Sequence, residues 1–160
     1  MAERKNINRG YRNLRVWQRA VDLYVLTCEK VNDFPGRPYK VMNQMMGAAA
    51  SVHGNIAEGY CRRSLREYLN FLNYALASLG ELGSYLFASY KAKQLDSQSF
   101  RELDELHYEV ENSLLKLIKR LQEKQKSGTW EETFVLRDGI QEYGLNDDCE
   151  GTREQNEDEL

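Results

Sequence analysis

Apolar residues recur at alternating spacings of three and four in four separate segments of this sequence. That spacing places them on one face of an α-helix, so each segment is predicted to be an amphipathic helix with a buried face. The only two prolines, Pro35 and Pro38, stand in one short connection, which leaves the rest of the chain free to be helical. The sequence therefore predicts an all-α, antiparallel up-down-up-down four-helix bundle over residues 13–126.

Signals for helix ends separate these segments. Asn13 is expected to cap the first helix, because its side chain can accept a hydrogen bond from a backbone N–H of the first turn. Ser64 and Glu67 have the spacing of a capping box at the start of the third helix. Either Ser97 or Ser99 is expected to cap the fourth. Each connection is short, which favours antiparallel neighbours.

The third segment carries two apolar stripes, whereas one stripe is enough for a helix of a monomeric bundle. The second of these stripes contains Tyr68, Phe71, Leu82 and Tyr85. Apolar side chains left in water in such a row mark a contact with another protein surface. The sequence therefore predicts that the chain forms a homo-oligomer through these four residues.

The formal net charge of −3 conceals a division along the chain. Residues 1–127 carry 20 Lys and Arg against 14 Asp and Glu, or +6, whereas residues 128–160 carry 2 against 11, or −9. We expect a basic N-terminal arm over residues 1–12. Residues 127–160 should form an acidic and largely disordered tail, because few of them are apolar enough to offset the entropy of ordering.

Basic side chains dominate the start of the first helix and the connection before the third. Guanidinium groups match the geometry of phosphate, so we expect RNA or DNA to bind there. The predicted nucleic-acid-binding residues are Arg4, Lys5, Arg9, Arg12, Arg15, Arg19, Arg62, Arg63 and Arg66. The same pattern is also compatible with a charged face that only contacts water.

The sequence gives little support for catalysis, and we expect neither enzymatic activity nor a cofactor. It contains no nucleotide-binding or hydrolase motif. Asp104, His107 and Glu111 share a helical face, but a di-metal bundle site needs a Glu-x-x-His motif on each of two helices, so no metal site is expected. The scattered cysteines and the lack of a long apolar stretch predict a cytoplasmic protein that does not enter a membrane.

Asn55 and Glu58 are polar residues on a second helix that is otherwise small and apolar. They could bond to a neighbouring helix and fix its register, or Glu58 could pair with Arg62 one turn later. Both interpretations give these residues a structural role.

Several motifs, in order, resemble the bacterial four-helix bundle family named for the intervening sequences of 23S ribosomal RNA genes. Residues 14–20 are similar to its opening L-x-V-W-Q-x-A, and residues 51–59 are similar to its S-V-x-x-N-I-A-E-G signature. The positions that carry this structural signature are Trp17, Asn55, Glu58 and Gly59. The resemblance covers roughly residues 11–121.

That family includes the accessory variability determinant proteins of diversity-generating retroelements. The resemblance implies a ring-like pentamer whose partners are RNA or DNA and a reverse transcriptase. The alternative is a protein-interaction scaffold with no direct role in binding nucleic acid. Two features depart from the family pattern: Met45 and Met46 stand where a basic pair is common, and the acidic tail is an addition.

Overall fold

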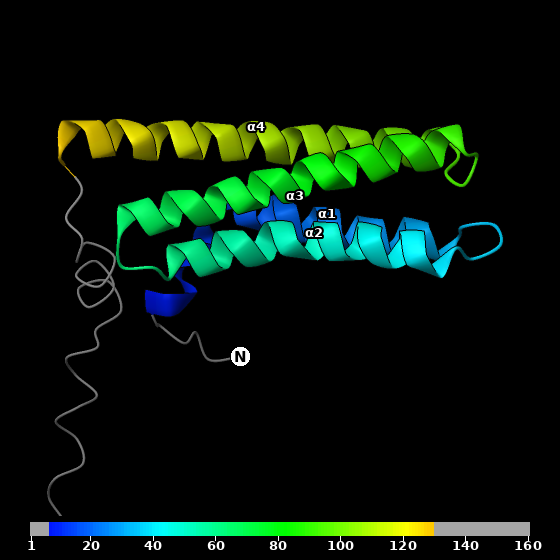
Figure 1. Ribbon diagram of the computed structural model, residues 1–160, viewed down its shortest axis with the longest axis horizontal. Helices are drawn as coiled ribbons and strands as arrows, with labels where there is room; N and C mark the ends of the chain where they lie inside the picture. Colours follow the sequence, from blue (N-terminus) through cyan, green and yellow to red (C-terminus); the bar gives the residue numbers. More distant parts are fainter. Residues whose placement is uncertain (1–6, 130–160) are drawn as a thin grey trace, which may run out of the picture.

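The computed structural model describes residues 7–129 and contains four long α-helices (Figure 1). A 3-10 helix, η1 (Ile7–Asn13), is followed by α1 (Arg15–Asn32), α2 (Tyr39–Tyr60), α3 (Leu65–Lys91) and α4 (Ser97–Ser127). Consecutive helices run antiparallel, and no strand occurs within the described range. The predicted all-α four-helix architecture is confirmed. The boundary predicted between arm and bundle falls inside η1, and the acidic tail lies almost wholly outside the described residues.

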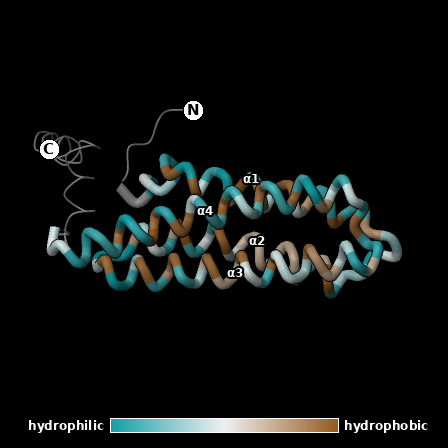
Figure 2. The backbone as a smooth tube through the Cα atoms, turned by 90° about the horizontal axis from the view of Figure 1, so that it is seen from above, coloured by the Kyte–Doolittle hydropathy of each residue, from teal (hydrophilic) through white to brown (hydrophobic). Residues whose placement is uncertain are grey.

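One apolar core runs along the bundle, and each of the four long helices contributes buried side chains to it. Leu23 of α1, Ile56 of α2, Leu72 of α3 and Leu114 of α4 are all fully buried. Figure 2 shows the hydrophobic positions recurring along the helices, as a helical period requires. None of the described helices combines the length and the apolar composition that crossing a lipid bilayer would need.

Three helix ends follow the sequence signals. Helix α1 ends at Asn32, before the two prolines. The hydroxyl of Ser64 accepts a hydrogen bond from the backbone N–H of Glu67 at 3.2 Å and donates one to the Glu67 carboxylate at 2.9 Å. Helix α4 ends at Ser127, and Gly128 follows it with a φ of 64°, a left-handed conformation that favours glycine.

Two helix starts differ from the prediction. Asn13 does not cap α1, because it belongs to η1, and Leu14 is the N-cap residue instead. Asp96, and neither Ser97 nor Ser99, caps α4, since its carboxylate accepts hydrogen bonds from two backbone N–H groups of the first turn. The Ser99 hydroxyl donates to the same carboxylate, and together these bonds lower the pKa of Asp96 to about 2.

The expectation that the second stripe of α3 faces solvent is wrong for two of its four residues. Tyr68 is 5% exposed and Leu82 is fully buried within the single chain. Helix α3 lies between α2 and α4 and contacts both, so it buries two stripes without a second subunit. Phe71 and Tyr85 remain half-buried. Burial also raises the pKa of the Tyr68 phenol.

Helices α2 and α3 approach most closely at Gly59. A Cβ atom at this position would lie 2.8 Å from the Cβ of Phe71 and 2.9 Å from the Cδ2 of Tyr68. Both distances are too short for van der Waals contact, so only glycine fits here without a shift of α3. The glycine of the signature is therefore required by helix packing.

Candidate nucleic-acid interface

The antiparallel order of the helices brings three basic parts of the sequence to the same end of the bundle. Helix η1, the connection between α2 and α3, and the last turns of α4 all lie there (Figure 1). We call their exposed basic side chains the basic end. They are Arg9, Arg12, Arg63, Arg66, Lys116, Lys119, Arg120, Lys124 and Lys126.

Four of the predicted arginines are exposed at the basic end. The side chains of Arg9, Arg12, Arg63 and Arg66 form no hydrogen bond or ion pair with any other residue of the described part of the chain. Their guanidinium groups are therefore available to a phosphate. The predicted residues Arg4 and Lys5 lie outside the described residues.

Arg62 has a different role from its neighbours. It forms an ion pair with Glu58, one turn earlier, and its guanidinium lies 4.5 Å from the ring centroid of Phe71. Of the two alternatives that the sequence left open for Glu58, the structure shows the pairing with Arg62. Asn55 donates a hydrogen bond to the backbone oxygen of Ser51 within its own helix, so it does not bridge to a neighbouring helix.

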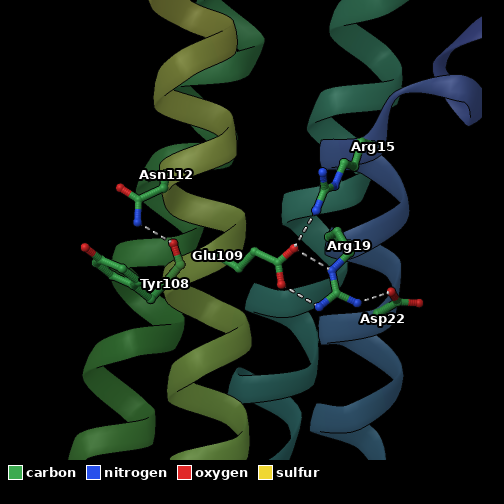
Figure 3. A network of polar contacts seen from close by, with 6 residues as sticks. All are labelled: Arg15, Arg19, Asp22, Tyr108, Glu109 and Asn112. Atoms are coloured by element: carbon green, nitrogen blue, oxygen red, sulfur yellow. Dashed lines mark hydrogen bonds and ion pairs between the residues drawn. The ribbon is translucent and has the colours of Figure 1, made fainter.

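Arg15 and Arg19 join α1 to α4 through one carboxylate (Figure 3). Arg19 donates to Glu109 Oε1 at 3.0 Å and also to Asp22 at 2.9 Å, whereas Arg15 Nη2 lies 3.7 Å from Glu109. The hydrogen bond from Arg19 lowers the pKa of Glu109 and keeps it ionised. Arg19 is thus largely neutralised, while the Arg15 side chain is 85% exposed.

An open groove lies between the start of α1 and residues 108–120 of α4, with a volume of about 640 Å³. Helix η1, which precedes the groove in the sequence, contacts α1 and α2 but not α4. Tyr11 of η1 packs edge-on against Trp17, with ring centroids 5.0 Å apart, and any side chain at Gly10 would collide with Tyr60. We call this space the α1–α4 groove. Its lining includes Arg15, Tyr108, Glu109, Asn112, Lys116 and Arg120.

The basic residues of α4 were missed by sequence reasoning, which considered only the first half of the chain. Lys116, Lys119, Arg120, Lys124 and Lys126 are distant in sequence from the predicted arginines, and only the antiparallel return of α4 brings them close. Their recurrence at spacings of three and four is a signal that could have identified them.

The predicted polar face of α4 contains a contact between helices. His107 Nε2 lies 2.7 Å from the backbone oxygen of Leu79 on α3. Gly83 leaves room for the imidazole, since a Cβ there would lie 3.1 Å from Nε2. Through this hydrogen bond His107 has a structural role, since it links α4 to α3. Among the described residues, no three His, Cys, Asp or Glu side chains are placed to hold a metal ion.

Comparisons with known proteins agree with this architecture. A family model described as 23S rRNA-intervening sequence protein matches residues 12–116. Among solved structures, one match is the crystal structure of a protein of unknown function from the S23 ribosomal protein family of Bacteroides thetaiotaomicron VPI-5482. It has a TM-score of 0.51 and 19% identity over 71% of this chain and 98% of that chain, a likeness that shows the fold alone. Comparison with curated proteins gives no significant match.

Proposed function

This chain belongs to the family of 23S rRNA-intervening sequence proteins, and from that premise we propose a non-enzymatic, oligomeric protein that binds RNA or DNA through its basic end. The observation that carries the proposal is the gathering of nine exposed basic side chains from three parts of the sequence. The exposed acidic side chains Glu67 and Glu123 on the same segments offset few of them. A surface of this kind attracts the phosphate backbone of any nucleic acid.

Binding that rests on phosphate contacts should weaken steeply as salt rises, because bound lysines and arginines release condensed counterions. The test is fluorescence anisotropy of the full chain with a labelled oligonucleotide over a salt series. Replacing Arg63 and Arg66 by Gln should lower the affinity and reduce the slope of log K against log salt by about 0.7–0.9 for each lost phosphate contact.

The matched control removes the same charge at the other end of the bundle. Lys40 and Lys93 are both exposed there, so the Lys40→Gln, Lys93→Gln double variant should bind as the parent chain does. Equal losses in the two double variants would show that the basic end is not the interface. Absence of binding by the parent chain at low salt would refute the proposed function.

The proposed subunit contact is the outer face of α2 and α3. Helix α2 has charged residues only at Lys40 and Glu58, and on α3 the rings of Tyr74 and Phe87 are 58% and 56% exposed. Few charges and exposed aromatic rings are typical of the centre of a protein interface. Light scattering should give a mass several times the 18.7 kDa of the chain, and a pentamer is the assembly that the motif resemblance suggests.

The same face, with its few charges and exposed rings, also supports an alternative function, a protein-interaction scaffold without a role in nucleic-acid binding. The scaffold predicts an assembly that fails to bind any oligonucleotide at low salt, so the anisotropy experiment separates the two functions. In its most specific form, our proposal is that the chain acts in the cytoplasm as an accessory protein of a reverse transcriptase. It rests on the motif resemblance, and co-purification of the two proteins tests it.

A further inference from the structure

The α1–α4 groove has a row of polar and aromatic side chains along one edge. Tyr108, Asn112, Lys116 and Arg120 follow one another at intervals of four on α4, which places them along one ridge of the helix. Arg15 stands on the opposite edge, at the start of α1. The groove thus has basic side chains on both edges.

Tyr108 is the most exposed of the large hydrophobic side chains in the described part of the chain, at 66%. Neither packing in the core nor contact with another ring of residues 7–129 accounts for its position there. An aromatic ring that lies in solvent beside cations is the arrangement on which nucleic-acid bases stack.

The charge of the groove is positive despite Glu109. Arg19 donates hydrogen bonds to both oxygens of this carboxylate, so its negative charge is already balanced. Lys116 and Arg120 have no ion-pair partner among residues 7–129, and Arg15 has only the contact to Glu109 at 3.7 Å. These three cations can therefore bind the phosphates of a ligand.

We propose that the α1–α4 groove holds one unpaired strand of RNA or DNA, with phosphates against Arg15, Lys116 and Arg120 and one base stacked on Tyr108. This inference rests on the proposed function and adds the form of nucleic acid that the protein prefers. In a duplex the faces of the bases are stacked on one another. Its phosphates can therefore contact the three cations, but none of its bases can stack on Tyr108.

The test compares one labelled oligonucleotide of mixed sequence, first as a single strand and then as a duplex, by fluorescence anisotropy with the full chain. The single strand should bind more tightly. Tyr108→Ala should weaken single-strand binding about ten-fold, because stacking on one aromatic ring has an effect of this size. Tyr108→Phe, which keeps the ring, should bind as the parent chain does, and duplex binding should be unchanged in both variants.

Tyr39→Ala is the matched control, since Tyr39 is 65% exposed at the start of α2, away from the groove, and should leave single-strand binding unaltered. Equal single-strand affinities of the parent chain and Tyr108→Ala, or a preference for the duplex, would overturn this inference while leaving the proposed function intact. Failure of the parent chain to bind either form would overturn both.

Discussion

Helices α2 and α4 belong to one bundle but present different surfaces. Helix α2 has two charged residues among 22, and its small side chains let it lie directly against α3. Helix α4 has 12 charged residues among 31 and is joined to α1 by an ion pair from Glu102 to Lys30 and by the ion pairs of Glu109 (the latter in Figure 3). The contact between α2 and α3 depends on shape, whereas that between α1 and α4 depends more on charge. We infer that the first supplies stability and that the second is free to bind a ligand.

The largest effect is expected from a cavity in the apolar core. Leu72 of α3 is fully buried, so Leu72→Ala should lower the free energy of unfolding by about 2–5 kcal/mol. Leu115→Ala on α4 is the control, because Leu115 is 45% exposed and its loss should change stability by less than about 0.5 kcal/mol. Urea denaturation followed by circular dichroism measures both. Similar losses in the two variants would contradict the assignment of stability to the apolar contact.

A smaller loss is expected where α2 touches α3. Gly59→Val should cost about 1–3 kcal/mol, since the new side chain would overlap Phe71 and Tyr68. A Cβ atom added at Gly80, on the outer side of α3, would meet only open space, so Gly80→Ala should instead stabilise the helix by up to about 1 kcal/mol. A loss of stability in Gly59→Val with a gain in Gly80→Ala would support close packing as the reason for glycine at position 59. A change of the same sign in both variants would exclude it.

Residues 128–160 should weaken nucleic-acid binding through charge alone. They carry −9, and they follow directly from the end of α4 at the basic end. A tethered acidic segment competes with phosphate at high effective concentration. Deleting these residues should raise the affinity for generic RNA or DNA at low salt by about ten-fold and steepen its salt dependence.

The control for the tail deletes the same residues, 128–160, from a chain in which Arg62, Arg63 and Arg66 are replaced by Gln. In this chain the deletion should no longer raise the affinity for nucleic acid. If the full and shortened chains bind equally at every salt concentration, the tail does not compete for the basic end.

The smallest effect is expected from the ion pair between α1 and α4. The Arg19 side chain is 36% exposed, so solvent screens it and Arg19→Gln should cost less than about 1 kcal/mol. The pKa of Glu109 is lowered in the folded chain, so this stabilisation is present above the ordinary pKa of glutamate and disappears as the pH falls through the lowered value. Stability curves of parent and variant should therefore converge in acid. If Arg19→Gln lowered the free energy of unfolding as much as Leu72→Ala does, the inference that the contact between α2 and α3 supplies stability would be contradicted.

The sequence was sufficient to predict the helices because their period, their prolines and the Ser64 cap all act locally. The errors arose where distant segments meet. Tyr68 and Leu82 looked like a surplus stripe, since the number of helices that surround α3 is a property of the packing. Asn13 was wrongly predicted to cap α1 because it belongs to η1, whose position depends on contacts with α1 and α2.

The candidate site could be predicted only in part for the same reason. Arg9, Arg12, Arg63 and Arg66 were identified from local charge, and the structure leaves them exposed. The α1–α4 groove is lined by residues of α1 and α4 that are far apart in the sequence, so it depends on how the helices pack. Its residues on α4, including Tyr108, were therefore found only from the structure.

Lysine footprinting tests most directly whether the charged end of α4 is where nucleic acid binds. The full chain is acetylated with and without a single-stranded oligonucleotide, and the modified lysines are quantified by mass spectrometry. Lys116, Lys119 and Lys126 should be protected, whereas Lys40 and Lys93, also exposed but at the other end of the bundle, should react at the same rate in both samples. Protection of Lys40 and Lys93 with no protection on α4 would contradict the account.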